Sequence, residues 1–155
     1  MEKSEYRRLA EKYIDIVYRA ALSCCCSRAD AEDAVQNTFL KLLTAEAAFD
    51  SEEHIRRWLI RVVVNECRNS YKRSRKMISL DELDLEPAVS EDDGQWLMEE
   101  IARLPSKYRA VLHLYYYEGY RCAEIAELLH ISESNVQTRL DRARKKLKAA
   151  IKEAE

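Results

Sequence analysis

The side chains best suited to chemistry lie on one predicted helix near the end of the chain. They can hydrogen-bond base edges or hold phosphates: Ser134, Asn135, Gln137, Thr138, Arg139, Arg142, Arg144 and Lys145. Ser132 is a suitable N-cap for this helix, which we expect to run from Glu133 to the end of the chain. A helix that enters the major groove contacts bases with its first turns, and the basic run behind them can hold the DNA backbone.

The preceding residues supply the other half of a helix-turn-helix unit. Two helices that cross closely need a small residue at the crossing, and Ala126 provides it. The wedge between the helices needs apolar residues, which are Ile125, Leu129, Ile131, Val136 and Leu140. His130 occupies the turn position where glycine is usual, and histidine tolerates the left-handed conformation better than most residues. A plain helical hairpin with a polar outer face is the alternative, but these features together favour DNA binding.

The charges alternate along the chain as basic, acidic and basic segments. Lys and Arg total 26 and Asp and Glu total 28, so the net charge of -2 hides this pattern. Basic residues dominate 56–76 and 139–152, whereas 81–100 contains acids and no base. Two basic helices suggest two contacts on a polyanion, although charge runs alone favour two solvated helix faces.

Composition predicts an all-α fold. The 155 residues are 47% hydrophobic and 35% charged, with only two glycines and two prolines. We expect two small helical domains, at 1–76 and 96–155, joined by an acidic linker at 77–95 that has no hydrophobic period.

Apolar spacing places the helices within these domains. The first runs from about Tyr6 to Cys24, and the second begins at Asp30 as its N-cap. We expect a loop at 44–54 and a third helix from Ile55 to about Lys76. Its expected apolar face is Trp58, Leu59, Val62 and Val63. In the second domain we expect helices ending at Pro105 and Gly119, a short helix at 124–129, and the final helix.

Several classes of protein are excluded by missing features. The start of the chain lacks an apolar core, and no stretch is long enough to span a membrane, so we expect no membrane insertion. Nucleophile elbows, P-loops and metal-ligand spacings are absent, which predicts no enzyme, no cofactor and no small-molecule substrate. The five cysteines lack framework spacing, so we expect reduced thiols in a cytoplasm, with core or neutral roles: Cys24, Cys25, Cys26, Cys67 and Cys122.

Both halves of the chain resemble bacterial RNA polymerase sigma factors. The second half carries the motifs of region four in order: Leu104-Pro105, Glu118-Gly119, Glu124-Ile125-Ala126 and Arg142-Ala143-Arg144. The first half is similar to region two at 30–41 and at 58–65. The chain consists of region two, a linker and region four, with little else. In this it resembles the extracytoplasmic-function (ECF) subgroup.

The resemblance implies separate surfaces for polymerase and promoter. The second helix would bind the β′ clamp coiled coil through Asp33, Gln36, Asn37, Leu40 and Lys41. Region four would bind the β flap tip and read the minus-thirty-five element. Residues implied to contact the minus-ten element are Phe49, Arg56, Arg57, Arg61, Asn65, Arg68, Lys72 and Arg73. Phe49 would either stack on a flipped base or tuck into the core and order its loop, and Trp58 is expected in the core rather than as a melting wedge.

These features predict a sigma factor that directs promoter-specific initiation in response to a signal, with an anti-sigma factor as a further partner. The acidic linker would thread the polymerase cleft, and we hypothesise that it shields the basic domains in the free protein. One rival is an ordinary repressor or activator that uses only the C-terminal unit. A second rival is a helical adaptor that binds no DNA.

Overall fold

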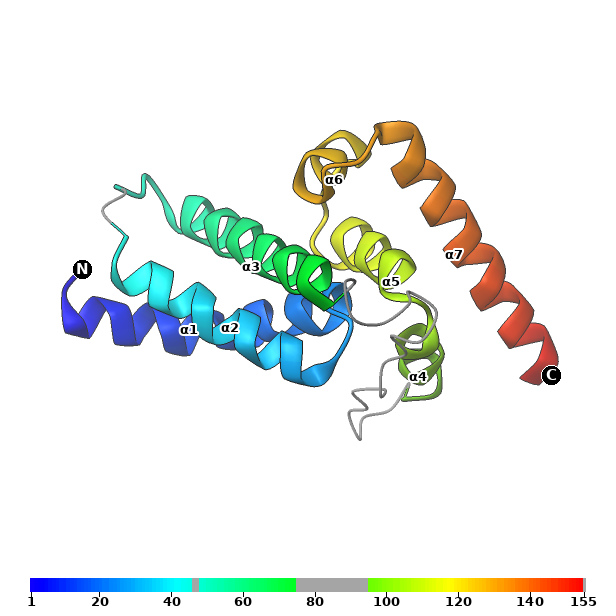
Figure 1. Cartoon of the computed structure of the whole chain (residues 1–155), viewed down its shortest axis with the longest axis horizontal. Coiled ribbons are helices and arrows are strands. Elements are labelled where there is room, and N and C mark those ends of the chain that lie inside the picture. Colours follow the sequence, from blue (N-terminus) through cyan, green and yellow to red (C-terminus); the bar gives the residue numbers. More distant parts are fainter. Residues whose placement is uncertain (46–47, 75–94, 155) are drawn as a thin grey trace.

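The structure is a computed structural model that describes residues 1–45, 48–74 and 95–154. Within those ranges all regular secondary structure is helical, which confirms the all-α prediction. Figure 1 shows a three-helix bundle in the N-terminal half and a second helical group in the C-terminal half, with the termini at opposite ends. No helix in the described part of the chain has the length and apolarity needed to cross a bilayer.

The N-terminal bundle consists of α1 (Lys3–Cys24), α2 (Arg28–Leu43) and α3 (Glu52–Ser74), and each helix packs against the other two. Its centre is fully buried and aliphatic, with Leu9, Val17, Leu42, Ile60 and Val63 at or near zero exposure. Burial of such side chains stabilises the bundle by about 1.5–3 kcal/mol each. The bundle fixes the outer faces of α2 and α3, which carry the predicted contacts.

Three local predictions for this bundle are wrong. The N-cap of α2 is Ser27 rather than Asp30, because the Ser27 hydroxyl accepts the Asp30 N–H at 3.1 Å. The predicted loop at 44–54 is too long, since α3 already begins at Glu52. The buried face of α3 also differs, because a helix that contacts both α1 and α2 hides more than one narrow stripe. Ile60 and Val64 are therefore buried, whereas Trp58 and Val62 are only half-buried.

The C-terminal group contains α4 (Gln95–Arg103), α5 (Ser106–Leu112), η2 (His113–Tyr117), α6 (Cys122–Leu129) and α7 (Glu133–Ala154). The helices α5, η2, α6 and α7 each contribute a fully buried side chain to its core. These are Val111, Leu114, Ile125 and Val136. The predicted helix that ends near Gly119 widens into the π-helical turn η2, which the sequence pattern did not predict. Gly119 follows it with φ of 75°, as expected of a glycine at a helix end.

The predicted linker at 77–95 lies outside the described residues except for Gln95, which belongs to α4. The hypothesis that its acids shield the basic domains therefore falls on residues that the structure does not describe.

A disulfide joins Cys25, at the end of α1, to Cys67 of α3. The prediction of reduced thiols is therefore wrong for this pair, although Cys24, Cys26 and Cys122 are free. The two residues are 42 positions apart, and no sequence spacing relates them. They meet because α1 and α3 pack side by side, so the contact exists only after the bundle has formed.

Candidate nucleic-acid interface

Helices α6 and α7 form the predicted helix-turn-helix unit. The Glu124 carboxylate accepts the Arg121 backbone N–H at 3.1 Å and so caps the start of α6. His130 ends α6 with φ of 57° and ψ of 45°, which confirms the predicted left-handed turn. The Ser132 hydroxyl accepts the Asn135 N–H at 3.0 Å, which confirms the predicted N-cap of α7. Ile125 and Val136 fill the wedge between the helices with no exposure.

The outer face of α7 presents the polar side chains that the sequence assigned to base contacts. Ser134, Asn135, Gln137, Thr138, Arg142 and Lys145 are all exposed. The Thr138 hydroxyl donates to the Ser134 carbonyl at 3.0 Å, so its oxygen can still accept a hydrogen bond from a ligand. Arg139 donates through Nε to the Asn135 side-chain oxygen at 3.2 Å, and partial burial lowers the pKa of its guanidinium. These groups can donate to and accept from base edges in a groove.

The Arg144 guanidinium already has partners within the C-terminal half. Its Nε donates to the Tyr116 hydroxyl at 2.6 Å, and Nη1 lies 3.2 Å from the Asp141 carboxylate. The guanidinium also lies over the rings of Tyr115 and Tyr116, at 5.8 and 5.4 Å from their centroids. The structure thus joins the Arg144 guanidinium to the aromatic surface of η2, although Arg144 lies two helical turns after Gln137 on nearly the same side of α7.

The predicted minus-ten residues lie along α3. Arg61, Lys72 and Arg73 are exposed, and Asn65 is half-buried. Two guanidinium nitrogens of Arg68, Nε and Nη1, are buried and have no hydrogen-bond partner among the described residues. Burying these charged donors without an acceptor costs free energy, which a hydrogen-bond acceptor at this point would offset.

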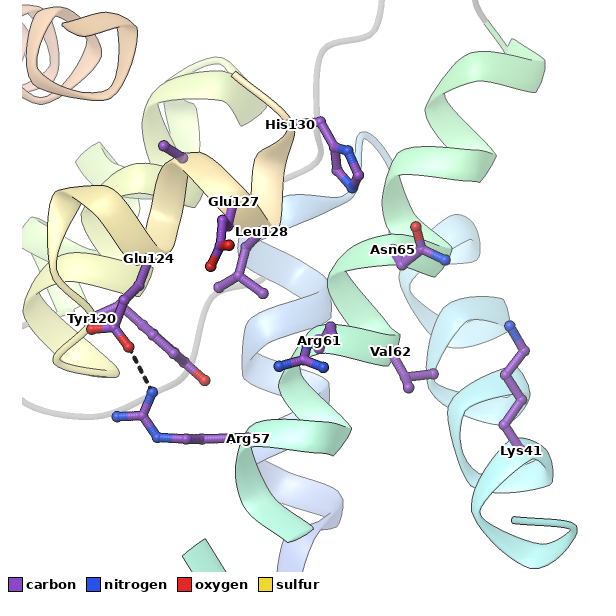
Figure 2. Close-up of a pocket in the computed structure, with 11 residues that line it drawn as sticks. Lys41, Arg57, Arg61, Val62, Asn65, Tyr120, Glu124, Glu127, Leu128 and His130 are labelled. Atoms are coloured by element: carbon purple, nitrogen blue, oxygen red, sulfur yellow. Dashed lines mark hydrogen bonds and ion pairs between the residues drawn. The ribbon is translucent and has the colours of Figure 1, made fainter. Parts of the chain in front are cut away.

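A cleft of about 750 Å³ separates α3 from α6. Figure 2 shows Arg57, Arg61 and Asn65 on the α3 side, facing Glu124, Leu128 and His130 across the cleft. Two predicted phosphate contacts on this helix, Arg56 and Arg57, are held by acids of the C-terminal half. Sequence reasoning did not find these partners.

Phe49 lies in the loop before α3 and is half-buried. Its ring contacts Trp58 edge to face, with centroids 5.6 Å apart, and the His54 ring at 5.3 Å. The half-buried Phe49 side chain thus packs against the start of α3. Trp58 packs at the edge of the core.

The predicted polymerase contacts lie on the outer face of α2. Asp33, Gln36, Leu40 and Lys41 are exposed, and Leu40 retains 58% of its accessible surface. Glu66 of α3, only 8% exposed, accepts Lys41 Nζ at 2.5 Å and Asn37 Nδ2 at 3.3 Å. Glu66 therefore orients two of the five predicted contacts. It is the lone acid in the basic run 56–76, and this isolation is the sequence signal that could have pointed to its role.

The fold and these surfaces define a two-domain DNA-binding protein of the helix-turn-helix type, with a second basic face on a separate bundle. Comparison with known proteins identifies the family. The family model described as "Sigma-70 region 2" matches residues 9–77, and "Sigma-70, region 4" matches residues 94–147. The chain belongs to the sigma-70 family, in its ECF group, whose members are transcription initiation factors and not enzymes.

Relatives and solved structures agree with this assignment. The chain is 29% identical over 149 residues to the ECF RNA polymerase sigma factor SigM of Bacillus subtilis, covering 90% of each chain. It is 29% identical over 164 residues to SigL of Mycobacterium tuberculosis, covering 98% of this chain and 92% of SigL. The fold matches sigma factor RpoE of Bartonella quintana, solved with the anti-sigma factor NepR, at a TM-score of 0.68, 21% identity and coverage of 96% and 97%. It also matches CnrH, solved with the cytosolic domain of CnrY, at a TM-score of 0.60, 25% identity and coverage of 99% and 92%.

Proposed function

We propose that this sigma factor divides promoter recognition between its two halves, with residues 1–76 and 96–155 as the two domains and 77–95 as the linker. As an ECF sigma factor, the chain binds core RNA polymerase and directs promoter-specific initiation. The observation that supports the division is that α3 and α7 each expose basic and polar side chains, in separate parts of the fold.

In this proposal α7 enters the major groove at the minus-thirty-five element. Its exposed Ser134, Asn135 and Gln137 contact base edges, and the basic residues behind them hold phosphates. Arg144 is bonded to Tyr116 of η2, so its proposed contribution to DNA binding is its positive charge.

The α3 face holds the minus-ten element. Arg61, Arg68, Lys72 and Arg73 bind phosphates of the separating strands, while Asn65 and the accessible edge of Phe49 contact unstacked bases. Unstacking a base costs a few kcal/mol, and contacts made only to the open strands supply that energy.

The exposed face of α2 is the proposed contact with the β′ clamp coiled coil. Leu40 supplies the apolar anchor, while Lys41 and Asn37 are held in place by Glu66. Region four binds the β flap tip in the same complex.

An anti-sigma factor is a further proposed partner, because the RpoE structure named above is a complex with an anti-sigma factor. The proposed site of action is the cytoplasm, where promoter DNA and polymerase are found.

Transcription with purified core polymerase tests this function. Core polymerase, genomic DNA fragments and this protein should yield run-off RNA from discrete start sites that core polymerase alone does not produce. A gel shift of duplex DNA that needs no polymerase, without new start sites, would instead support the repressor or activator. Binding to neither polymerase nor DNA would support the adaptor.

A further inference from the structure

Three consecutive tyrosines are exposed on η2, outside the helix-turn-helix unit. Tyr115, Tyr116 and Tyr117 retain 37%, 61% and 50% of their accessible surface. The turn is π-helical, and the Glu118 N–H donates to the His113 carbonyl at 3.0 Å. A π-helix has more residues per turn than an α-helix, so consecutive side chains are separated by less than the roughly 100° of an α-helix and can share one outer face. Packing in the core therefore does not account for these rings.

Two sets of contacts divide this aromatic surface. The Tyr117 hydroxyl accepts a hydrogen bond from Arg19 of α1. The rings of Tyr115 and Tyr116 instead meet edge to face, with centroids 4.9 Å apart. The Arg144 guanidinium of α7 lies over both of these rings, at 5.8 and 5.4 Å from their centroids. The pair formed by Tyr115 and Tyr116 is thus the part of η2 that borders the helix proposed to read DNA.

Tyr116 and Arg144 leave two hydrogen-bond donors unused. The Tyr116 hydroxyl accepts Arg144 Nε at 2.6 Å, which leaves its own O–H free to donate. Arg144 Nη1 lies 3.2 Å from the Asp141 carboxylate, whereas Nη2 has no hydrogen-bond partner among the residues that the structure describes. The Arg144 side chain keeps 44% of its accessible surface, so a ligand can reach this pair from solvent.

The position of the pair on α7 indicates its ligand. Arg144 follows Gln137 by seven residues, which places them about 20° apart around the helix axis and about 10 Å apart along it. A duplex that contacts Gln137 with its bases therefore brings its backbone close to Arg144. A guanidinium with a hydroxyl beside it offers two donors to the oxygens of one phosphate. Asp141 is 67% exposed, so solvent screens the repulsion between its carboxylate and that phosphate.

We propose that Tyr116 and Arg144 together bind one phosphate of the duplex that α7 reads, so that the DNA surface of region four extends onto η2. The Tyr116 hydroxyl donates to the phosphate and also fixes the guanidinium, so that Arg144 Nη2 donates to the same group. Tyr115 supports the guanidinium with its ring and needs no hydroxyl to do so. The inference rests on the proposed contact between α7 and the minus-thirty-five element.

Neutral phosphate analogues test this contact. Each phosphate of a promoter duplex is replaced in turn by methylphosphonate, which removes the charge and leaves the bases unchanged. At one position beside the minus-thirty-five element, wild-type holoenzyme should lose affinity about tenfold, because charge-assisted hydrogen bonds are lost there. The loss at this position should shrink to about twofold in Tyr116→Phe and vanish in Arg144→Ala, while all other positions keep their effects. Identical profiles for the three proteins would overturn the inference.

Tyr115→Phe is the matched control, because it removes a hydroxyl that bonds to no described residue and keeps the ring beside Arg144. On the unmodified promoter, Tyr116→Phe should weaken holoenzyme binding about fivefold for all sequences alike, and Tyr115→Phe should leave it unchanged. Arg144→Ala should flatten the slope of log K against log salt by about 0.9, whereas Tyr116→Phe removes no charge and should keep the slope. Circular dichroism should show the same helical signal for each variant. An equal loss of affinity in both phenylalanine variants would also overturn the inference.

A random-sequence duplex separates this contact from the proposed function. Phosphate contacts do not depend on base sequence, so Tyr116→Phe should also weaken binding of the free protein to such a duplex at low salt. If run-off transcription yields no promoter-specific RNA, the proposed function fails, and the random duplex still decides whether Tyr116 contacts DNA. Equal affinities of wild type and Tyr116→Phe for this duplex would reject the contact, whatever transcription shows.

Discussion

Arg109 of region four completes the end of a helix in region two: its Nη2 donates to the Cys25 carbonyl at 2.8 Å. The last turn of α1 carries no basic residue of its own, so its carbonyl groups lack the cation that would complement the helix dipole. Arg109 supplies that cation from α5. Burial lowers the pKa of its guanidinium to about 10, which still leaves it charged at neutral pH.

Arg109→Met should separate the two halves, because methionine keeps an unbranched apolar stem but removes every donor. Hydrogen bonds from charged donors are worth about 1.5–3 kcal/mol each, so the closed arrangement should lose most of its advantage. Small-angle scattering should show a larger radius of gyration, while circular dichroism keeps its helical signal. Arg103→Met is the control, because Arg103 is exposed and pairs with Glu100 in its own helix. Equal radii for the two variants would contradict this role.

Leu40→Ala should weaken binding to core polymerase without destabilising the protein. Leu40 is 58% exposed, so its truncation leaves no cavity in the free protein. Truncation of an anchor residue that is buried in an interface typically costs more than about 1 kcal/mol of binding free energy. Affinity for core polymerase can be measured by fluorescence anisotropy and stability by urea unfolding. Ile14→Ala, 41% exposed on α1, is the matched control and should change neither quantity. A similar loss of affinity in both variants would argue against the α2 contact.

Gln137→Ala and Arg142→Ala should affect the minus-thirty-five element differently. Gln137 is proposed to contact a base edge, so its loss should reduce discrimination at one position by about 1–3 kcal/mol. Arg142 is proposed to contact a phosphate, so its loss should weaken all sequences alike and flatten the salt slope by about 0.9. Holoenzyme binding to a set of single-base promoter variants, at several salt concentrations, measures both. Identical profiles for the two variants would refute the division of roles on α7.

Cys67→Ser should destabilise the oxidised protein by removing its bond to Cys25. Closing a loop of 42 residues corresponds to about 4 kcal/mol in the loop-entropy treatment. Urea unfolding without reductant should show this difference in the free energy of unfolding. Dithiothreitol should lower the free energy of unfolding of the wild type to nearly that of the variant. Cys122→Ser, which removes a free cysteine, should change little. Wild type that unfolds identically with and without dithiothreitol would show that the bond contributes nothing.

Acidification should remove the contribution of Glu52, which joins the start of α3 to α1. The Tyr13 hydroxyl donates to its carboxylate at 2.5 Å, and this bond, followed by those from Arg8 and Lys12, lowers the pKa of Glu52 to about 2. A depressed carboxyl pKa stabilises the fold above the unfolded value near 4.5, and that stability is lost as pH falls through about 2. The melting temperature of the wild type should therefore exceed that of Glu52→Gln at pH 7, and this difference in melting temperature should vanish near pH 2. A difference that stays constant over this range would contradict the assignment.

Features that depend on neighbouring residues were predictable from the sequence. The helix-turn-helix unit followed from Ala126, the apolar wedge and the Ser132 cap, and the left-handed conformation of His130 followed from its place after α6. Two local predictions failed in detail. Ser27 rather than Asp30 caps α2, and the second half of the helix before Gly119 widens to a π-turn. The Ser27 cap is a local contact between residues three apart, so hydrophobic spacing alone does not distinguish it from a cap at Asp30.

The sequence by itself determined the helices, the helix-turn-helix motif and the family resemblance, because residues within one or two helical turns fix capping, periodicity and motif spacing. The tertiary structure alone decided which charges and thiols meet. Arg57 and Glu124 are 67 positions apart, Arg109 and Cys25 are 84 apart, and Cys25 and Cys67 are 42 apart. Such contacts form only when α1 and α3 pack together and the C-terminal half closes on them. A net charge of -2 therefore conceals arginines whose negative partners come from the other half of the same chain.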